Sequence, residues 1–197
     1  MQKSELARRA AALQEKMGQL GLDGVLAAQN MSMYYLSGTM QCQYVYVPAA
    51  GESFGLVRKN LARAEAEAGI PVVPINGFSD MGAAIAARGT PRRLGVEMDV
   101  LPAEIFFRLQ KVFPQSELLN AAPAIREVRQ VKSAYELEQF RLAAQQVDTL
   151  YRQIPQLLEI GKEEVVFAAE CEAVLRSLGH QGISRMRRFN SEMYYGH

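Results

Sequence analysis

The organisation of this chain turns on one stretch, Ile125-Arg-Glu-Val-Arg-Gln-Val-Lys-Ser-Ala-Tyr-Glu-Leu-Glu-Gln-Phe140. Its first half is basic, with Arg126, Arg129 and Lys132, and it predicts a weakly structured linker. Ser133 then stands three residues before Glu136, which is the spacing of a capping box that satisfies free backbone groups at a helix start. The stretch therefore predicts a joint between two domains, residues 1–125 and residues 126–197.

The composition is that of a chain with a real core. Of the 197 residues, 49% are hydrophobic and 22% are charged, which excludes a disordered chain. The formal net charge of +1 gives no field for binding nucleic acid, so we expect no such partner. No apolar run approaches the roughly 20 residues that span a bilayer, and the charged N-terminus does not resemble a signal peptide. We expect a cytoplasmic protein without membrane contact, in which Cys42 and Cys171 stay reduced.

Before the joint, apolar stretches of helical and of strand spacing alternate. We expect helices at residues 4–20, 30–38, 61–68, 81–88 and 101–113, and strands at residues 25–28, 43–47, 54–57, 72–75, 93–97 and 116–119. The turn residues at 50–53 predict a hairpin, and Pro74 predicts an edge strand. This alternation predicts an α/β domain, a mixed sheet with helices on both faces.

After the joint the pattern is helical. An apolar stripe runs from Ser133 to about Ile160, where Pro155 is expected to kink the helix or end it early. A second helix is expected at residues 162–178, and residues 184–195 could begin a strand or hairpin.

Motifs for known chemistry are missing from the sequence. His180 and His197 have no partner at zinc-ligand spacing, and the four aspartates are scattered. There is no glycine-rich nucleotide loop and no nucleophile elbow. The loop from Tyr34 to Tyr44 does stand out, because exposed Tyr, Met and Gln often form contact surfaces. Packing of Tyr34 and Tyr35 in the core is the other interpretation.

The order of several segments resembles a known family. These are the opening amphipathic helix, Leu22-Asp-Gly-Val-Leu26, Asn30-Met-Ser-Met-Tyr-Tyr-Leu-Ser-Gly38, the hairpin, and a linker with Arg126, Lys132, Ser133, Glu136 and Leu137. Together they resemble the N-terminal domain of the creatinase/prolidase/Xaa-Pro aminopeptidase family. The helices that follow resemble the opening of its pita-bread catalytic domain, so the resemblance implies a helical segment of a truncated pita-bread domain.

The resemblance implies a parent hydrolase that cleaves the peptide bond before proline with two divalent metal ions, Mn, Co or Zn. The family's metal ligands lie C-terminal to the region matched here, so we expect no metal ligand and no catalytic residue in this chain. The role of a further active-site histidine is not carried over to His197, because the turn that precedes it in the family is absent. The fragment itself is expected to be inactive.

The resemblance also implies a homodimer in which this domain lends a loop to the neighbouring subunit's active site. Gln41, Gln43 and Tyr44 are then expected at the rim of a pocket for a proline-containing peptide. Three alternatives remain open: a stand-alone α/β binding or regulatory module, a fragment of a creatinase-type amidinohydrolase, and an unrelated α/β protein that binds a small molecule.

Overall fold

The computed structural model describes residues 2–182, so the strand or hairpin expected at 184–195 and His197 lie outside the described residues. The chain divides into two compact units, which meet between Val131 and Lys132.

The first unit is built on a six-stranded sheet. Its strands are β1 (Gly24–Ala27), β2 (Tyr44–Pro48), β3 (Phe54–Val57), β4 (Val72–Pro74), β5 (Arg93–Val96) and β6 (Glu117–Asn120). Their order in the sheet is β4-β3-β2-β1-β5-β6. Strand β2 is antiparallel to β1 and β3, and the other neighbouring pairs are parallel. The sheet is therefore mixed, with β4 and its Pro74 at an edge as expected.

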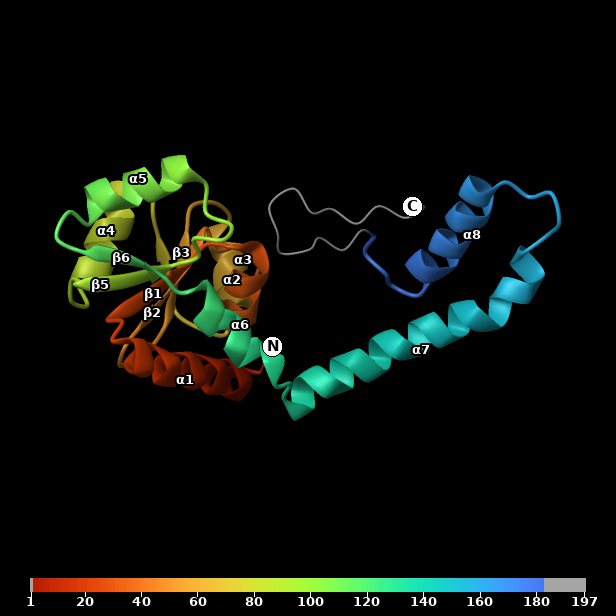
Figure 1. Ribbon diagram of the computed structural model, residues 1–197, viewed down its shortest axis with the longest axis horizontal. Helices are drawn as coiled ribbons and strands as arrows, with labels where there is room; N and C mark the ends of the chain where they lie inside the picture. The colour runs from red at the N-terminus through yellow and green to blue at the C-terminus, as the bar shows by residue number, and fades with distance from the viewer. Residues whose placement is uncertain (1, 183–197) are drawn as a thin grey trace. The chain divides into compact units, whose positions relative to one another are not determined.

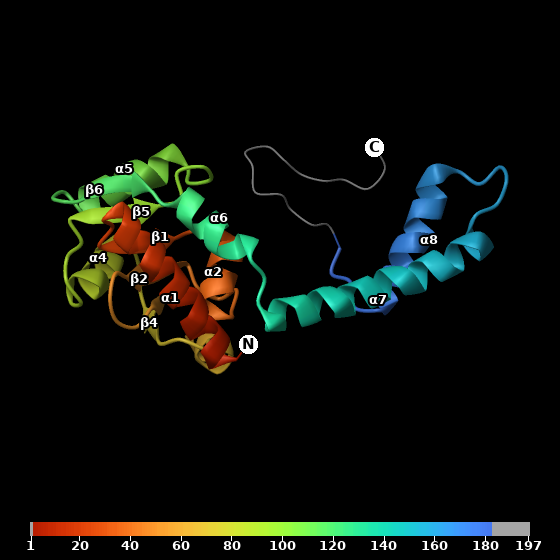
Figure 2. The same cartoon turned by 60° about the horizontal axis from the view of Figure 1, so that its bottom comes forward.

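Helices cover both faces of this sheet (Figures 1 and 2). The helices of the unit are α1 (Lys3–Leu20), α2 (Asn30–Ser37), α3 (Leu61–Glu67), α4 (Phe78–Ala86), α5 (Ala103–Val112) and α6 (Ala122–Gln130). One core cluster joins the sheet to α1, α2, α3 and α6, and a second joins its other face to α4 and α5. The predicted α/β class is confirmed.

Alternation along the strands assigns side chains to these two cores. In β2, Val45 and Val47 belong to the cluster under α1, whereas Tyr44 and Tyr46 belong to the cluster under α4 and α5. Successive strand residues point to opposite faces, so a strand with helices on both sides is apolar along its whole length. This explains why the buried strands lack a polar face.

The linker expected before Lys132 was wrong, because Arg126 and Arg129 belong to helix α6. The buried side of this helix, Ala122, Ala124 and Ile125, packs in the same core as α1. Arg126 lies on the exposed side, where its guanidinium pairs with Asp99 at 3.2 Å. Arg129 is half-buried, with its guanidinium carbon 5.6 Å from the centre of the Tyr35 ring. The apolar residues at helical spacing decide this segment, and the basic residues between them do not prevent a helix.

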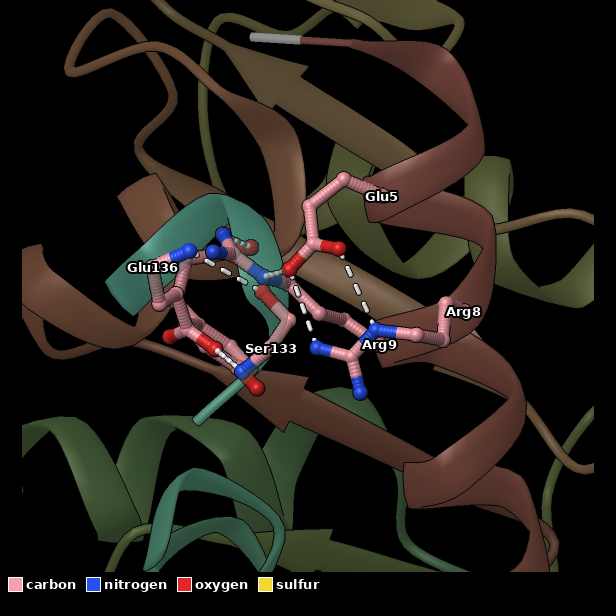
Figure 3. Close-up of polar contacts among 6 residues, drawn as sticks. Glu5, Arg8, Arg9, Ser133 and Glu136 are labelled. Carbon is pink, nitrogen blue, oxygen red and sulfur yellow. Dashed lines mark hydrogen bonds and ion pairs between the residues drawn. The ribbon is translucent and has the colours of Figure 1, made fainter. Parts of the chain in front are cut away.

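The second unit begins with the predicted capping box. Ser133 Oγ accepts a hydrogen bond from Glu136 N at 3.1 Å, and Ser133 N donates to Glu136 Oε2 at 3.0 Å (Figure 3). Helix α7 (Ala134–Leu157) follows and ends two residues after Pro155. Helix α8 (Glu164–Ser177) lies beside it, joined by Gln146 Nε2, which donates to Leu178 O at 2.8 Å. Within the described part of the chain, neither α7 nor α8 has a buried residue.

Candidate functional site

The carboxyl ends of the five parallel strands meet at one edge of the sheet. Arg58 follows β3, Ile75 and Asn76 follow β4, and Glu97 follows β5. Tyr44 lies at the same edge, because it begins the antiparallel strand β2. Ligands of open α/β sheets bind outside the carboxyl ends of the strands, so a ligand-binding site is expected at this edge.

Residues 39–43 form a loop at this edge that is held from both ends. Thr39 Oγ1 donates to Glu67 Oε2 at 2.7 Å, and Gln41 N donates to Thr39 Oγ1 at 3.1 Å. Gln43 N donates to Leu56 O at 2.7 Å. Hydrogen bonds from Arg63 and then from Thr39 lower the pKa of the Glu67 carboxyl, which keeps the anchor charged.

Cys42 fixes the middle of the loop against the sheet. Its side chain is buried, and burial raises the pKa of the thiol, so it is held as a neutral apolar group. Gly55 of β3 lies under it, and a Cβ at that position would stand 2.5 Å from Cys42 Sγ. The strand needs glycine here because the loop approaches its backbone so closely.

A cavity of about 170 Å³ opens beside this loop. It is lined by Gln43, Tyr44, Arg58, Ile75, Asn76, Gly77, Phe78 and Arg108. The Tyr44 ring faces the Phe78 ring with centroids 6.3 Å apart, and Arg108 Cζ stands 5.6 Å from the Phe78 centroid. The cavity thus combines an aromatic wall with two guanidinium groups.

Tyr44 shows how these groups act on one another. Burial raises the pKa of its hydroxyl, while a hydrogen bond with Gln43 and the positive charges of Arg108 and Arg58 act in the opposite direction. Both arginines are therefore close enough to Tyr44 to act on the pKa of its hydroxyl.

The structure brings two of the three expected rim residues together. Gln43 and Tyr44 line the cavity, whereas Gln41 does not. Sequence reasoning missed Arg58, Asn76 and Arg108. The signal for Arg58 and Asn76 was their position just after β3 and β4, but Arg108 comes from helix α5 and only the fold brings it here.

The two tyrosines of this loop differ: Tyr34 fits the contact-surface interpretation, and Tyr35 fits packing in the core. Tyr34 is 37% exposed, and Tyr35 is buried. The Arg9 guanidinium stands 4.0 Å from the centre of the Tyr35 ring and donates to Tyr35 O at 2.9 Å. Arg9 is itself buried and paired with Glu5 at 2.8 Å (Figure 3). This cluster joins α1 to α2 and has a structural role.

The buried carboxylate of Glu97 also has a structural role at the carboxyl edge. Its Oε2 accepts hydrogen bonds from Ala28 N and Gln29 N, each at 2.8 Å, and its Oε1 accepts from Ser32 Oγ at 2.7 Å. The carboxylate ties the end of β5 to the turn between β1 and α2, and its oxygens are occupied by these donors.

Residues 2–182 do not assemble a metal-binding group of three or more His, Cys, Asp or Glu. His180 Nδ1 accepts a hydrogen bond from Gly182 N at 3.1 Å, which is a local turn contact. Within the same range no helix has the length and apolar character needed to cross a bilayer.

Comparison with protein families shows to which family this domain belongs. Residues 9–131 match the creatinase/prolidase N-terminal domain. This chain belongs to that family. The match ends at Val131, which is also the last residue of the first compact unit.

Curated relatives of this creatinase/prolidase N-terminal domain protein are peptidases. This chain is 29% identical over 169 residues to a Xaa-Pro dipeptidase of Pyrococcus horikoshii, and the match covers 84% of this chain and 46% of that protein. It is 25% identical over 176 residues to the uncharacterized peptidase YqhT of Bacillus subtilis, covering 85% of this chain and 48% of that protein. The chain spans about half the length of the curated relatives it matches.

Solved structures share the fold. A Xaa-Pro dipeptidase from Bacillus anthracis superposes with a TM-score of 0.83 at 19% identity, over 91% of this chain and 51% of that one. The prolidase from Pyrococcus horikoshii gives a TM-score of 0.77 at 24% identity, over 88% and 50%. The fold expected from the resemblance is confirmed.

Proposed function

We propose that this chain is the N-terminal, non-catalytic part of a Xaa-Pro peptidase. The observation that carries the proposal is the family match over residues 9–131 together with the Xaa-Pro dipeptidase of Pyrococcus horikoshii, of which the chain covers less than half. The family description spans creatinases and prolidases, and both curated relatives are peptidases, which favours the peptidase branch over a creatinase-type amidinohydrolase.

In this proposal the parent enzyme hydrolyses the peptide bond before proline with two divalent metal ions, Mn, Co or Zn. The described residues 2–182 do not fit such a metal centre, since they contain no cluster of suitable ligands. We therefore derive no catalytic step from them. Their proposed roles are pairing of subunits and shaping the substrate pocket.

The loop of residues 39–43 and the start of β2 would form the rim of the neighbouring subunit's pocket. Support comes from the way the loop is held: Thr39 is bonded to Glu67, and Cys42 is packed on Gly55. A loop anchored at these points can present Gln41, Gln43 and Tyr44 at low entropic cost. A proline-containing peptide is the ligand that the proposed parent activity requires.

Kinetics of the intact peptidase test the rim. Gln43→Ala and Tyr44→Phe should each raise KM for a Xaa-Pro dipeptide roughly three- to tenfold with kcat little changed, because they remove one contact made in both ground and transition states. Gln115→Ala is the matched control, since Gln115 is exposed and precedes β6 at the opposite edge. Unchanged KM in both rim variants would refute the proposed rim.

The 197-residue chain tests the other two parts of the proposal. With Mn²⁺ or Co²⁺ added, it should not hydrolyse a Xaa-Pro dipeptide, and measurable turnover would contradict a non-catalytic role. Size-exclusion chromatography with light scattering should give the mass of a dimer. A monomer at every concentration tested would remove the proposed role in subunit pairing.

A further inference from the structure

The cavity beside β2 is lined by two arginines and by no acidic residue. The arginines are Arg58 and Arg108, among eight lining residues. The Arg58 side chain makes no ion pair or hydrogen bond with any described residue. Exposed arginines usually pair with a nearby carboxylate or are hydrated by water. Two of them at the mouth of one cavity therefore create a local site for an anion.

Arg108 keeps most of its donors available. Its Nη2 donates to Glu104 Oε1 at 2.5 Å, in an exposed pair one helical turn apart. Such surface pairs contribute little, and a guanidinium has five N–H groups, so this contact leaves room for a ligand. The start of α4 adds no positive charge, because the Asp80 carboxylate in its first turn accepts hydrogen bonds from Asn76 N at 2.8 Å and Asn76 Nδ2 at 2.9 Å. The two guanidinium groups are therefore the cationic part of this wall.

The remaining wall is apolar. Ile75 is buried, and the rings of Tyr44 and Phe78 face each other at 6.3 Å with a 55° tilt. An inorganic anion would leave this wall without a partner, whereas an organic acid would cover it. The volume of about 170 Å³ is below the roughly 300–1,000 Å³ typical of pockets for drug-sized ligands, so the ligand must be small.

We propose that this cavity binds a small organic carboxylate, with the carboxylate between Arg58 and Arg108 and the apolar body against Tyr44 and Phe78. Guanidinium forks match the geometry of a carboxylate, and the cavity lies at the carboxyl edge where open α/β sheets bind ligands. The proposal does not depend on the peptidase role, because it needs no catalytic residue and no second subunit.

Titration of the 197-residue chain tests the ligand class. Benzoate should produce saturable shifts of the Asn76 and Gly77 amide signals in heteronuclear NMR spectra, with a dissociation constant in the millimolar range. Benzamide has the same ring without the charge, and inorganic phosphate has charge without the ring. Both should bind at least about tenfold more weakly than benzoate, since each lacks one half of the match.

Variants test the two arginines. Arg58→Gln and Arg108→Gln should each weaken benzoate binding about tenfold or more, because a charge-assisted pair is lost. Both side chains are exposed, so circular dichroism should show an unchanged fold. Arg92→Gln is the matched control: it removes the same charge from an exposed residue just before β5, at the opposite edge, and should leave binding unchanged.

Three results would overturn the proposal. Benzoate shifts that do not saturate would mean that there is no site. Equal affinity for phosphate or benzamide would remove the paired requirement for charge and apolar surface. An equal loss of benzoate binding in Arg92→Gln would show that net charge, and not this cavity, attracts the ligand.

Discussion

The two units of this chain contain similar amphipathic segments, but they differ in what covers them. In residues 2–131 the apolar sides of the helices close on a sheet, and residues such as Met17, Met81 and Ile85 have no exposed surface. In residues 132–182 the helices bury no residue, and Phe140 of α7 is 59% exposed. An apolar stripe predicts a helix, but only a packing partner converts that stripe into stability.

A matched pair of phenylalanine substitutions gives the largest expected difference between the units. Phe54→Ala removes a side chain that is 1% exposed and should lower the free energy of unfolding by about 3–5 kcal/mol. Phe140→Ala should change it by less than about 0.5 kcal/mol, because the ring is already in solvent. Urea denaturation followed by circular dichroism measures both. A large loss in Phe140→Ala would mean that the stripe of α7 is covered in solution.

The close packing of the loop on the sheet gives the next effect. Gly55→Ala should cost about 1–3 kcal/mol, because the new methyl group meets Cys42 Sγ at 2.5 Å. In a Cys42→Ala background the same change should cost less, and the difference is a double-mutant coupling energy. Gly18→Ala is the control: nothing lies within 4 Å of its Cβ position in α1, so it should stabilise the helix by about 0.5–1 kcal/mol. Equal costs in both Gly55 backgrounds would contradict the contact.

The capping box gives a smaller effect confined to the second unit. Ser133→Ala removes the acceptor for Glu136 N and should cost α7 about 1 kcal/mol. On heating the Ser133→Ala variant, the helical circular dichroism signal should begin to fall at a lower temperature than that at which the first unit unfolds. Ser177→Ala, at the end of α8, makes a matched control without a capping role. A shift of the main unfolding transition by Ser133→Ala would show that α7 unfolds together with the sheet.

Much of the fold could be predicted because its signals are local. Strand alternation gave β2 and β3, Pro74 indicated an edge, and Ser133 with Glu136 marked the start of α7. The sequence did not predict helix α6, because its buried side is made of only Ala122, Ala124 and Ile125. The basic residues Arg126 and Arg129 instead suggested a linker. Small residues give a weak periodic signal, although they allow the helix to approach its neighbours closely.

The candidate cavity could be predicted only in part, for a physical reason. Gln43 and Tyr44 stand out locally, in a Tyr- and Gln-rich loop. Arg58 and Arg108 are fifty positions apart in the sequence and line one cavity only because the fold places the end of β3 and the middle of α5 beside it. Helix α4 also begins at Phe78 and not at the expected Met81, and this places the Phe78 ring against Tyr44. Such a wall depends on tertiary packing, which no local pattern encodes.

The smallest expected effect is a pH-dependent loosening of the loop in the otherwise stable unit. The pKa of Glu67 is lowered in the fold, so its contribution is present above the ordinary value of 4.5 and is lost as pH falls through the lowered value. Acidification below about pH 4.5 should therefore weaken the bond from Thr39 Oγ1 and expose the Gln41 amide. Amide hydrogen exchange of Gln41, corrected for its intrinsic pH dependence, measures the change.

Two variants decide whether the Glu67 carboxylate is the cause. Glu67→Gln should reduce the protection of the Gln41 amide at neutral pH and remove most of its acid dependence, because the neutral amide accepts a weaker hydrogen bond. Glu65→Gln changes an exposed carboxylate on the same helix and should keep the wild-type profile. If Glu67→Gln kept full protection and the same acid response, the loop would be held without Glu67, by the packing of Cys42 on Gly55 and the hydrogen bond from Gln43 N to Leu56 O.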